Sequence, residues 1–131
     1  MVIVDTTIWV DYLRGTDTPH TAWLDREIER RRLGLTDLIQ CEVLQGVSDE
    51  HTALATRREL LKFRIFTTGS VELATRAAQN YRTLRTRGIT IRRTLDFLIA
   101  TYCLLEQHAL LHNDRDFDPF ERELALQVVH P

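Results

Sequence analysis

Short apolar runs along the chain alternate with longer stretches in which apolar residues recur every three or four positions. The β-branched run at residues 2–4 predicts a buried strand that ends at Asp5. Further strands are expected over residues 34–36, 63–66, 109–112 and 126–129. Helical spacing predicts helices from residue 6 to the break at Gly15, and over residues 21–32, 37–46, 49–62, 71–87 and 95–107, with a short one within 115–124.

Cap signals mark several helix ends. Asp37, with Gln40 three residues later, indicates a start of the capping-box kind. Ser70 and Thr94 are expected to cap the helices that follow them. Gly88 suits the position just after a helix, where left-handed backbone is common.

Because strands alternate with helices, we expect an α/β protein with a central parallel sheet that helices cover on both faces. The 131 residues, of which 44% are hydrophobic and 27% charged, suffice for one domain with one core. No repeat, low-complexity stretch or linker divides the chain, so residues 1–131 are expected to form a single domain.

The charged residues are unevenly distributed. The formal net charge is only −2, but residues 57–93 hold ten basic and two acidic side chains, which leaves the rest of the chain acidic. Such asymmetry predicts two electrostatic faces on one small protein.

Several features bear on the cellular compartment. Cys41 and Cys103 form neither a CxxC pair nor a disulfide framework, which fits a reducing environment. The N-terminus lacks a basic region followed by a long apolar one, so no signal peptide is expected. No apolar run approaches the ~18 residues that span a bilayer. We therefore expect a cytoplasmic protein without membrane contact.

Four acidic residues from separate segments are expected to meet at one edge of the sheet. Asp5 and Asp114 follow two predicted strands, and ligands of open parallel sheets bind beyond the carboxyl ends of the strands. Asp96 lies in the first turn of a helix that begins near that edge, and Glu42 lies about one turn into the helix after the second strand. If the strands before Asp5 and Asp114 are neighbours, all the carboxylates face one crevice.

Carboxylates that gather in a partly dry site cannot all stay ionised without a compensating charge. Hard oxygen ligands favour Mg²⁺ or Mn²⁺ over zinc. Such an ion lowers the pKa of a bound water and accepts a phosphate oxygen as a ligand. The cluster therefore predicts a divalent-cation site suited to hydrolysis of a phosphodiester.

Each acid taken alone also has a simpler interpretation. Asp5 could cap a helix, and Asp96 could complement a helix dipole. Glu42 could be an exposed helix residue, although its i±4 neighbours are apolar or small. The acids of residues 114–118 could form a solvated loop, whereas a calcium loop would need a glycine and a distal glutamate that are missing. Only the joint pattern favours a site.

The same acids lie in four segments that resemble the acidic motifs of the PIN-domain family. The opening Val-Ile-Val-Asp-Thr-Thr resembles the first-strand signature, and residues 39–46 around Glu42 resemble the second motif. Residues 94–100 around Asp96 resemble the third, and Leu-His-Asn-Asp-Arg-Asp-Phe at 111–117 the fourth. The match spans nearly the whole chain, and its length and motif style are most similar to the VapC-type toxins.

The resemblance implies a three-layer αβα fold and a Mg²⁺- or Mn²⁺-dependent endoribonuclease. It implies that the hydroxyl of Thr6 or Thr7 positions a water or a phosphate. Our own hypothesis is that Glu42 orients or deprotonates the attacking water. The resemblance also implies a homodimer that a cognate VapB-type antitoxin silences. The acids it assigns to metal binding and catalysis are Asp5, Glu42, Asp96, Asp114 and Asp116.

RNA must be brought to this acidic pocket by a basic rim. Arg92 and Arg93 immediately precede Asp96 and are the best candidates, together with Arg85, Arg87 and Arg115. Exposed loops of structured RNA, such as those of tRNA or rRNA, are the expected substrate because their bases are unstacked.

The apolar surface of residues 8–24 and 38–44 is a candidate groove for an antitoxin helix. His108 and His112 are four residues apart but separated by a helix end, so structural or surface roles are expected for both. We expect four aromatic residues to contact the core or the antitoxin interface rather than RNA bases. They are Trp9, Tyr12, Trp23 and Phe63.

Other classes fit less well. Phosphatases of the haloacid-dehalogenase kind need a second Asp two residues after the first, where Thr7 stands. A receiver-like domain needs a mid-chain phosphoacceptor Asp and a downstream lysine, and Lys62 is the only lysine. No G-x-S-x-G motif of the triad hydrolases occurs. A catalytically silent PIN-like module that binds RNA or protein is the remaining alternative.

Overall fold

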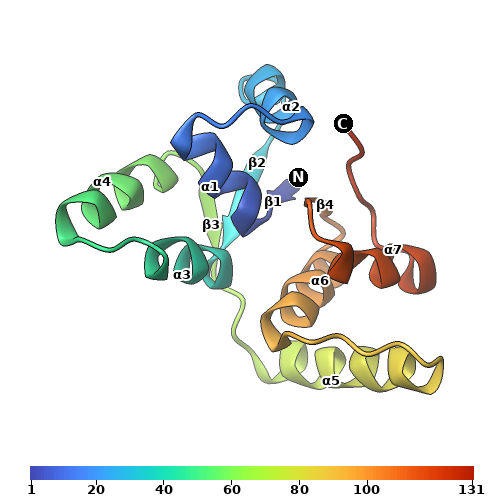
Figure 1. Cartoon of the computed structure of the whole chain (residues 1–131). Coiled ribbons are helices and arrows are strands. Elements are labelled where there is room, and N and C mark those ends of the chain that lie inside the picture. The colour runs from blue at the N-terminus through green and yellow to red at the C-terminus, as the bar shows by residue number, and fades with distance from the viewer.

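The computed structural model describes residues 1–131 and has three layers, with a four-stranded sheet between two sets of helices (Figure 1). The strands are β1 (Val2–Val4), β2 (Leu33–Thr36), β3 (Arg64–Phe66) and β4 (Ala109–Leu111). The helices are α1 (Thr6–Arg14), α2 (Pro19–Glu27), α3 (Asp37–Gln45), α4 (Glu50–Leu60), α5 (Val71–Thr86), α6 (Thr94–Glu106) and α7 (Asp118–Leu124), with a 3-10 turn η1 (Arg115–Phe117). The expected α/β fold with a central parallel sheet is confirmed.

The order of the strands places the site. The sheet has the order β3-β2-β1-β4, and every neighbouring pair is parallel. The chain adds β2 and β3 on one side of β1 and then crosses to add β4 on the other side. Ligand crevices of open α/β sheets form where the strand order reverses in this way. β1 and β4 are thus the neighbours that the expected meeting of Asp5 and Asp114 requires.

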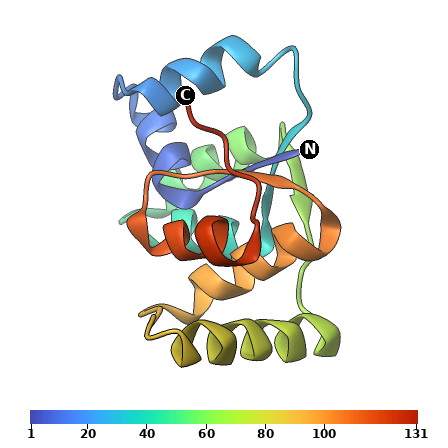
Figure 2. The ribbon, with the colours of Figure 1, turned by 90° about the vertical axis from the view of Figure 1, so that its right-hand side faces the viewer.

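Helices cover both faces of the sheet. In Figure 1, α1, α3 and α4 lie on one side of the sheet, and α6 and α7 lie on the other. Figure 2 shows α5 packed along α6, at the opposite end of the molecule from α2. Because β1 is covered on both faces, all three of its residues are buried. None of the seven helices combines the length and apolar character that crossing a bilayer requires.

Gly34 allows β2 and β3 to lie close together. A Cβ at this position would lie 2.8 Å from the backbone oxygen of Arg64 and 3.2 Å from the sulfur of Met1. Backbone atoms cannot yield as a flexible side chain can, so a larger residue would push the two strands apart.

The start of α3 differs from the expected capping box. Thr36, not Asp37, is the N-cap, and its hydroxyl accepts the N–H of Ile39 at 3.1 Å. Since β2 runs into α3 without a loop, Asp37 is already helical. Its carboxylate instead accepts the hydroxyl of Thr68 at 2.6 Å, which ties the segment after β3 to α3.

Other helix ends are partly as expected. Ser70 caps α5, and Gly88 follows the helix with φ +79°, so both predictions are confirmed. The prediction for Thr94 is wrong, because Arg93 occupies the N-cap position of α6 and Thr94 is the first helical residue. The helix expected over 21–32 is α2, which begins earlier because Thr18 forms a capping box with Thr21, and which ends earlier than expected, at Glu27.

The strand expected over residues 126–129 does not form. Only one bridge, between Leu110 and Val128, joins this segment to β4. Leu110 makes both of the hydrogen bonds concerned, donating to Gln127 and accepting from Val129. The segment follows directly on Ala125, whose left-handed backbone ends α7, and its apolar pattern is explained by burial of Leu126.

Candidate functional site

Asp5 lies between β1 and α1. Its N–H donates to the carbonyl of Leu111 in β4 at 2.9 Å, so its backbone is fixed against the neighbouring strand. The residue has the extended backbone of an N-cap, but its side chain accepts no capping hydrogen bond. It is 4% exposed. The helix-cap interpretation therefore does not account for this buried carboxylate.

Asp96, Asp114 and Asp116 form a compact acid cluster, in which one carboxylate oxygen of each lies within 4.8 Å of the others. Asp96, in the first turn of α6, is 3% exposed, and the two other acids are half-buried after β4. The Oδ2 atom of Asp96 is buried and has no hydrogen-bond partner. A buried carboxylate oxygen without a donor is costly, and a divalent cation with oxygen ligands would satisfy it. The donor set thus fits Mg²⁺ or Mn²⁺.

Burial and repulsion between carboxylates raise the pKa values of Asp5 and Asp96. Burial is the main cause for Asp5, whose pKa rises to about 7, and Glu42, Asp96 and Asp114 add repulsion. The pKa of Asp96 rises to about 6, mainly through burial and also through repulsion by Asp114, whereas the positive charge of Arg93 opposes the rise. The acids at positions 5, 42, 96 and 114 therefore interact as one electrostatic cluster, as groups in functional sites commonly do.

Glu42 joins this cluster through a contact with Thr6. The Thr6 hydroxyl donates to Oε1 of Glu42 at 2.8 Å. Both residues are half-buried, whereas Thr7 is exposed. Of the two hydroxyls proposed from the sequence, that of Thr6 is the one at the site, and Glu42 is not a free surface glutamate.

His112 makes a specific contact with Asp114 that the sequence does not predict. The N–H of Asp114 donates to Nδ1 of His112 at 3.1 Å, and the N–H of Asp116 donates to Oδ1 of Asp114 at 2.9 Å. The His112 ring is buried, and burial lowers its pKa. The sequence signal for this contact is that His112 stands two residues before Asp114. Side chains often hydrogen-bond to the backbone over that spacing. His108 instead lies against the rings of Phe66 and Tyr102.

Two of the arginines proposed for RNA binding border the acids. Arg92 is 84% exposed, and its nearest guanidinium nitrogen lies 3.9 Å from Oδ1 of Asp116. Arg93 occupies the N-cap position of α6, and its positive charge favours the ionised form of Asp96. Arg85 lies over the ring of Tyr81, at 5.6 Å from its centroid.

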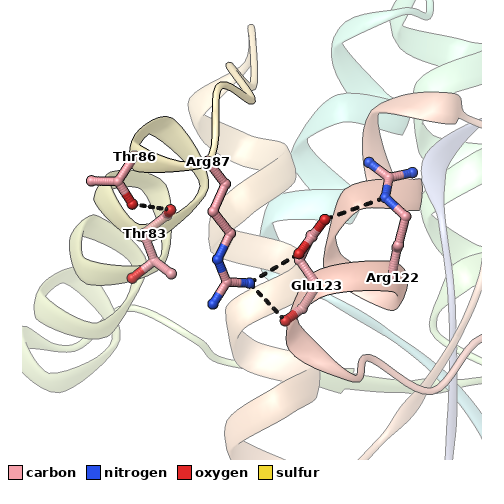
Figure 3. Close-up of polar contacts among 5 residues, drawn as sticks. All are labelled: Thr83, Thr86, Arg87, Arg122 and Glu123. Atoms are coloured by element: carbon pink, nitrogen blue, oxygen red, sulfur yellow. Dashed lines mark hydrogen bonds and ion pairs between the residues drawn. The ribbon is translucent and has the colours of Figure 1, made fainter.

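Arg87 is engaged with α7 instead (Figure 3). One of its guanidinium nitrogens donates to the carboxylate of Glu123 at 3.0 Å and to the backbone oxygen of the same residue at 3.2 Å. Arg122 contacts the other carboxylate oxygen of Glu123 at 3.5 Å. The end of α5 is thereby tied to α7. Arg115 is exposed in η1, between two of the acids.

A groove of about 380 Å³ lies between α1, α3 and α4. Its apolar lining includes Val10, Leu13, Val43 and Val47, and Glu42 also borders it. It overlaps the apolar surface that the sequence indicates. The expectation that Trp9 lies in the core is confirmed, since it is fully buried with its ring centroid 4.6 Å from that of Phe63.

Comparisons with known proteins agree with this architecture. The family model described as the PIN domain matches residues 2–123. VapC ribonuclease Mb1587 of Mycobacterium bovis and ribonuclease VapC11 of Mycobacterium tuberculosis are each 30% identical to this chain over 131 residues. Each match covers 98% of this chain and 98% of the relative. Among solved structures, VapBC2 from Rickettsia felis bound to a fragment of promoter DNA is similar in fold, with a TM-score of 0.79, 17% identity and 98% coverage of both chains.

Proposed function

This chain belongs to the PIN-domain family, as a VapC-type ribonuclease, and on that premise we propose that it is a metal-dependent endoribonuclease that acts as the toxin of a type II toxin–antitoxin pair. The observation that supports the metal dependence is the cluster of Asp96, Asp114 and Asp116, in which buried Asp96 has a carboxylate oxygen without a hydrogen-bond donor. Residues 1–131 would form a single nuclease domain, acting in the cytoplasm.

The cation would be Mg²⁺ or Mn²⁺. Asp96, Asp114 and Asp116 would hold it, with Asp5 and Glu42 binding alongside, some of them through water. When bound, the ion would supply Lewis-acid stabilisation of the charge that develops on the scissile phosphate. Neutralising the cluster would also let the buried carboxylates stay ionised near neutral pH.

Glu42 and Thr6 would act on the attacking water. With one oxygen held by the Thr6 hydroxyl, the Glu42 carboxylate has a fixed direction and can accept a hydrogen bond, and then a proton, from a water at its other oxygen. The water oxygen would attack phosphorus as the bond to the leaving ribose oxygen breaks. A water held in one direction reacts faster than a freely tumbling one.

The substrate would be an exposed loop of structured RNA, such as a tRNA or rRNA loop. Arg92 and Arg93 border the acids and would contact backbone phosphates, with Arg85 and Arg115 extending the rim. One guanidinium nitrogen of Arg87 already donates a hydrogen bond to Glu123, so we expect Arg87 to contribute less to RNA binding. Phosphate contacts of this kind position RNA, and unstacked bases can then be read.

A VapB-type antitoxin would be the partner. The name VapBC2 of the similar Rickettsia felis structure joins a VapB to a VapC component. The groove between α1, α3 and α4 would accept an amphipathic helix of the antitoxin. Because Glu42 borders the groove, a bound segment would also reach the acid cluster. We further propose that the toxin itself is a homodimer.

Cleavage of purified total RNA tests the enzymatic proposal. Discrete fragments should appear with Mg²⁺ or Mn²⁺ and disappear with EDTA. Asp96→Asn should lower the cleavage rate more than about 100-fold, because it removes a buried ligand. Asp118→Asn is the matched control, since Asp118 is exposed at the start of α7, outside the acid cluster, and should be dispensable. Cleavage that survives EDTA, or an Asp96→Asn variant as active as the control, would contradict the proposal; RNA binding without any cleavage would support the silent module.

A further inference from the structure

Two side-chain-to-backbone hydrogen bonds, each spanning two residues, link His112, Asp114 and Asp116 after β4. His112 accepts the N–H of Asp114, and Asp114 accepts the N–H of Asp116. A bond from a side chain to the backbone two residues later fixes the local backbone. Asp114 and Asp116 belong to the acid cluster with Asp96. His112 therefore begins a chain of contacts that ends in the cluster.

The imidazole of His112 is not explained by packing alone. Its ring is 7% exposed, and its centroid lies 5.0 Å from that of Phe117. Because an N–H donates to Nδ1, this nitrogen carries no hydrogen, and the hydrogen of the neutral ring is on Nε2. Nε2 is buried without a partner. A buried donor without an acceptor costs stability, so an apolar ring would pack here as well or better. What histidine adds over such a ring is the Nδ1 acceptor.

We propose that His112 is a positioning residue of the acid cluster: its Nδ1 holds the N–H of Asp114 and so sets the direction in which Asp114 and Asp116 present their carboxylates toward Asp96. This inference rests on the proposed function, because it assigns His112 a part in the proposed cation site. His112 is not a ligand, since one ring nitrogen accepts the amide and the other is buried.

Cation binding is sensitive to such positioning. Octahedral Mg²⁺ holds oxygens at about 2.1 Å, which places them roughly 3–4 Å from one another. The cluster is already close to this spacing, with one oxygen of each acid within 4.8 Å of the others. Releasing the Asp114 amide would allow its carboxylate to turn away. Losing a group that orients a metal ligand typically weakens metal binding about 10- to 100-fold.

Two substitutions separate positioning from packing. His112→Phe keeps a ring against Phe117 but removes the acceptor. His112→Asn places an amide oxygen where Nδ1 was, because both atoms are bonded to Cγ, but it removes most of the ring. A packing role predicts that the Asn variant is the more damaged in every respect. A positioning role predicts opposite orders for stability and for metal affinity.

The measurements are thermal denaturation in EDTA and Mn²⁺ titration calorimetry of the full chain without RNA. For His112→Phe we expect a Tm equal to or above that of the wild type and a Kd for Mn²⁺ weakened about tenfold or more. For His112→Asn we expect a lower Tm and a Kd within about threefold of the wild type. In the metal-free protein, amide hydrogen exchange of Asp114 should be faster in the Phe variant than in the wild type.

Each contrary result has a distinct meaning. Wild-type Mn²⁺ affinity and unchanged Asp114 exchange in His112→Phe would overturn the inference and leave the cation site intact. This variant alone decides the matter if His112→Asn does not fold. The proposed function and this inference would be overturned together if the wild-type protein bound no Mn²⁺, or if the Asp96→Asn variant bound it as tightly as the wild type.

Discussion

The hydroxyl of Thr6 donates a 2.8 Å hydrogen bond to Oε1 of Glu42, which stands 36 positions later in the chain. The bond joins the first residue of α1, directly after Asp5, to α3. It fixes one oxygen of the Glu42 carboxylate and leaves the other free to accept a bond from water. The bond thus holds the Glu42 carboxylate near the other acids, although α3 contains none of them.

This contact predicts the effect of changing Thr6. Thr6→Val keeps the size of the side chain but removes the donor, so Glu42 loses its orientation and kcat for RNA cleavage should fall roughly tenfold or more. KM should change less, because the hydroxyl already has a partner within the protein. Thr6→Ser restores the donor and should remain within about threefold of the wild type. Steady-state cleavage of a defined RNA measures both; a fully active Val variant would show that the contact is dispensable.

The raised pKa values predict that the metal-free protein loses stability as pH rises. The folded pKa is about 7 for Asp5 and about 6 for Asp96, against an ordinary value of 3.8. The folded state therefore holds more protons than the unfolded chain, and this stability is complete below about pH 4 and lost as pH rises through the folded values. In EDTA, Tm should be about 5 °C or more lower at pH 8 than at pH 5. A Tm that rises over this range would contradict the shifts.

The raised pKa values of Asp5 and Asp96 also predict how added metal changes Tm at different pH values. Mg²⁺ or Mn²⁺ should raise Tm more at pH 8 than at pH 5, because ionised carboxylates bind a cation and protonated ones do not. Asp96→Asn removes one of the repelling charges, so it should flatten the pH dependence in EDTA and abolish most of the metal effect. Denaturation scans at the two pH values, with and without metal, compare the variant with the wild type. An equal gain from metal in both proteins would place binding elsewhere.

The positions of the arginines predict unequal contributions to RNA binding. Arg92→Gln and Arg93→Gln each remove a charge beside the acids, so each should weaken RNA binding and lower the dependence of log Kd on log salt by about one unit. Arg87→Gln should do less of both, since this side chain is paired with Glu123, and the loss of such an exposed pair should cost only about 0–1 kcal/mol of stability. Binding of a metal-free protein to labelled RNA at several salt concentrations decides the order.

The groove between α1, α3 and α4 predicts where the antitoxin binds. Val47→Glu places a charge in the half-buried apolar lining and should weaken complex formation at least tenfold, because the charge is desolvated when the groove is covered. Val71→Glu is the control, since Val71 is 85% exposed at the start of α5. Co-purification and titration with a cognate VapB-type antitoxin measure both. Equal affinity of the two variants would place the interface elsewhere.

The sequence by itself determined the order of strands and helices and the set of candidate acids. The β-branched run before Asp5 and the helical spacing after Ser70 are local signals, set by residues a few positions apart. Only the tertiary structure decided which atoms meet. It brought Asp96, Asp114 and Asp116 together, and it left residues 126–129 with a single bridge to β4.

The pairing of Thr6 with Glu42 and the chain of bonds from His112 were likewise settled by folding. The physical reason is one of range. Periodicity and capping act within a turn or a strand, whereas contacts across 36 residues depend on the order in which parallel strands pair and on how helices pack over them. Many sequences share the local pattern, but one packing fixes the directions of buried carboxylates.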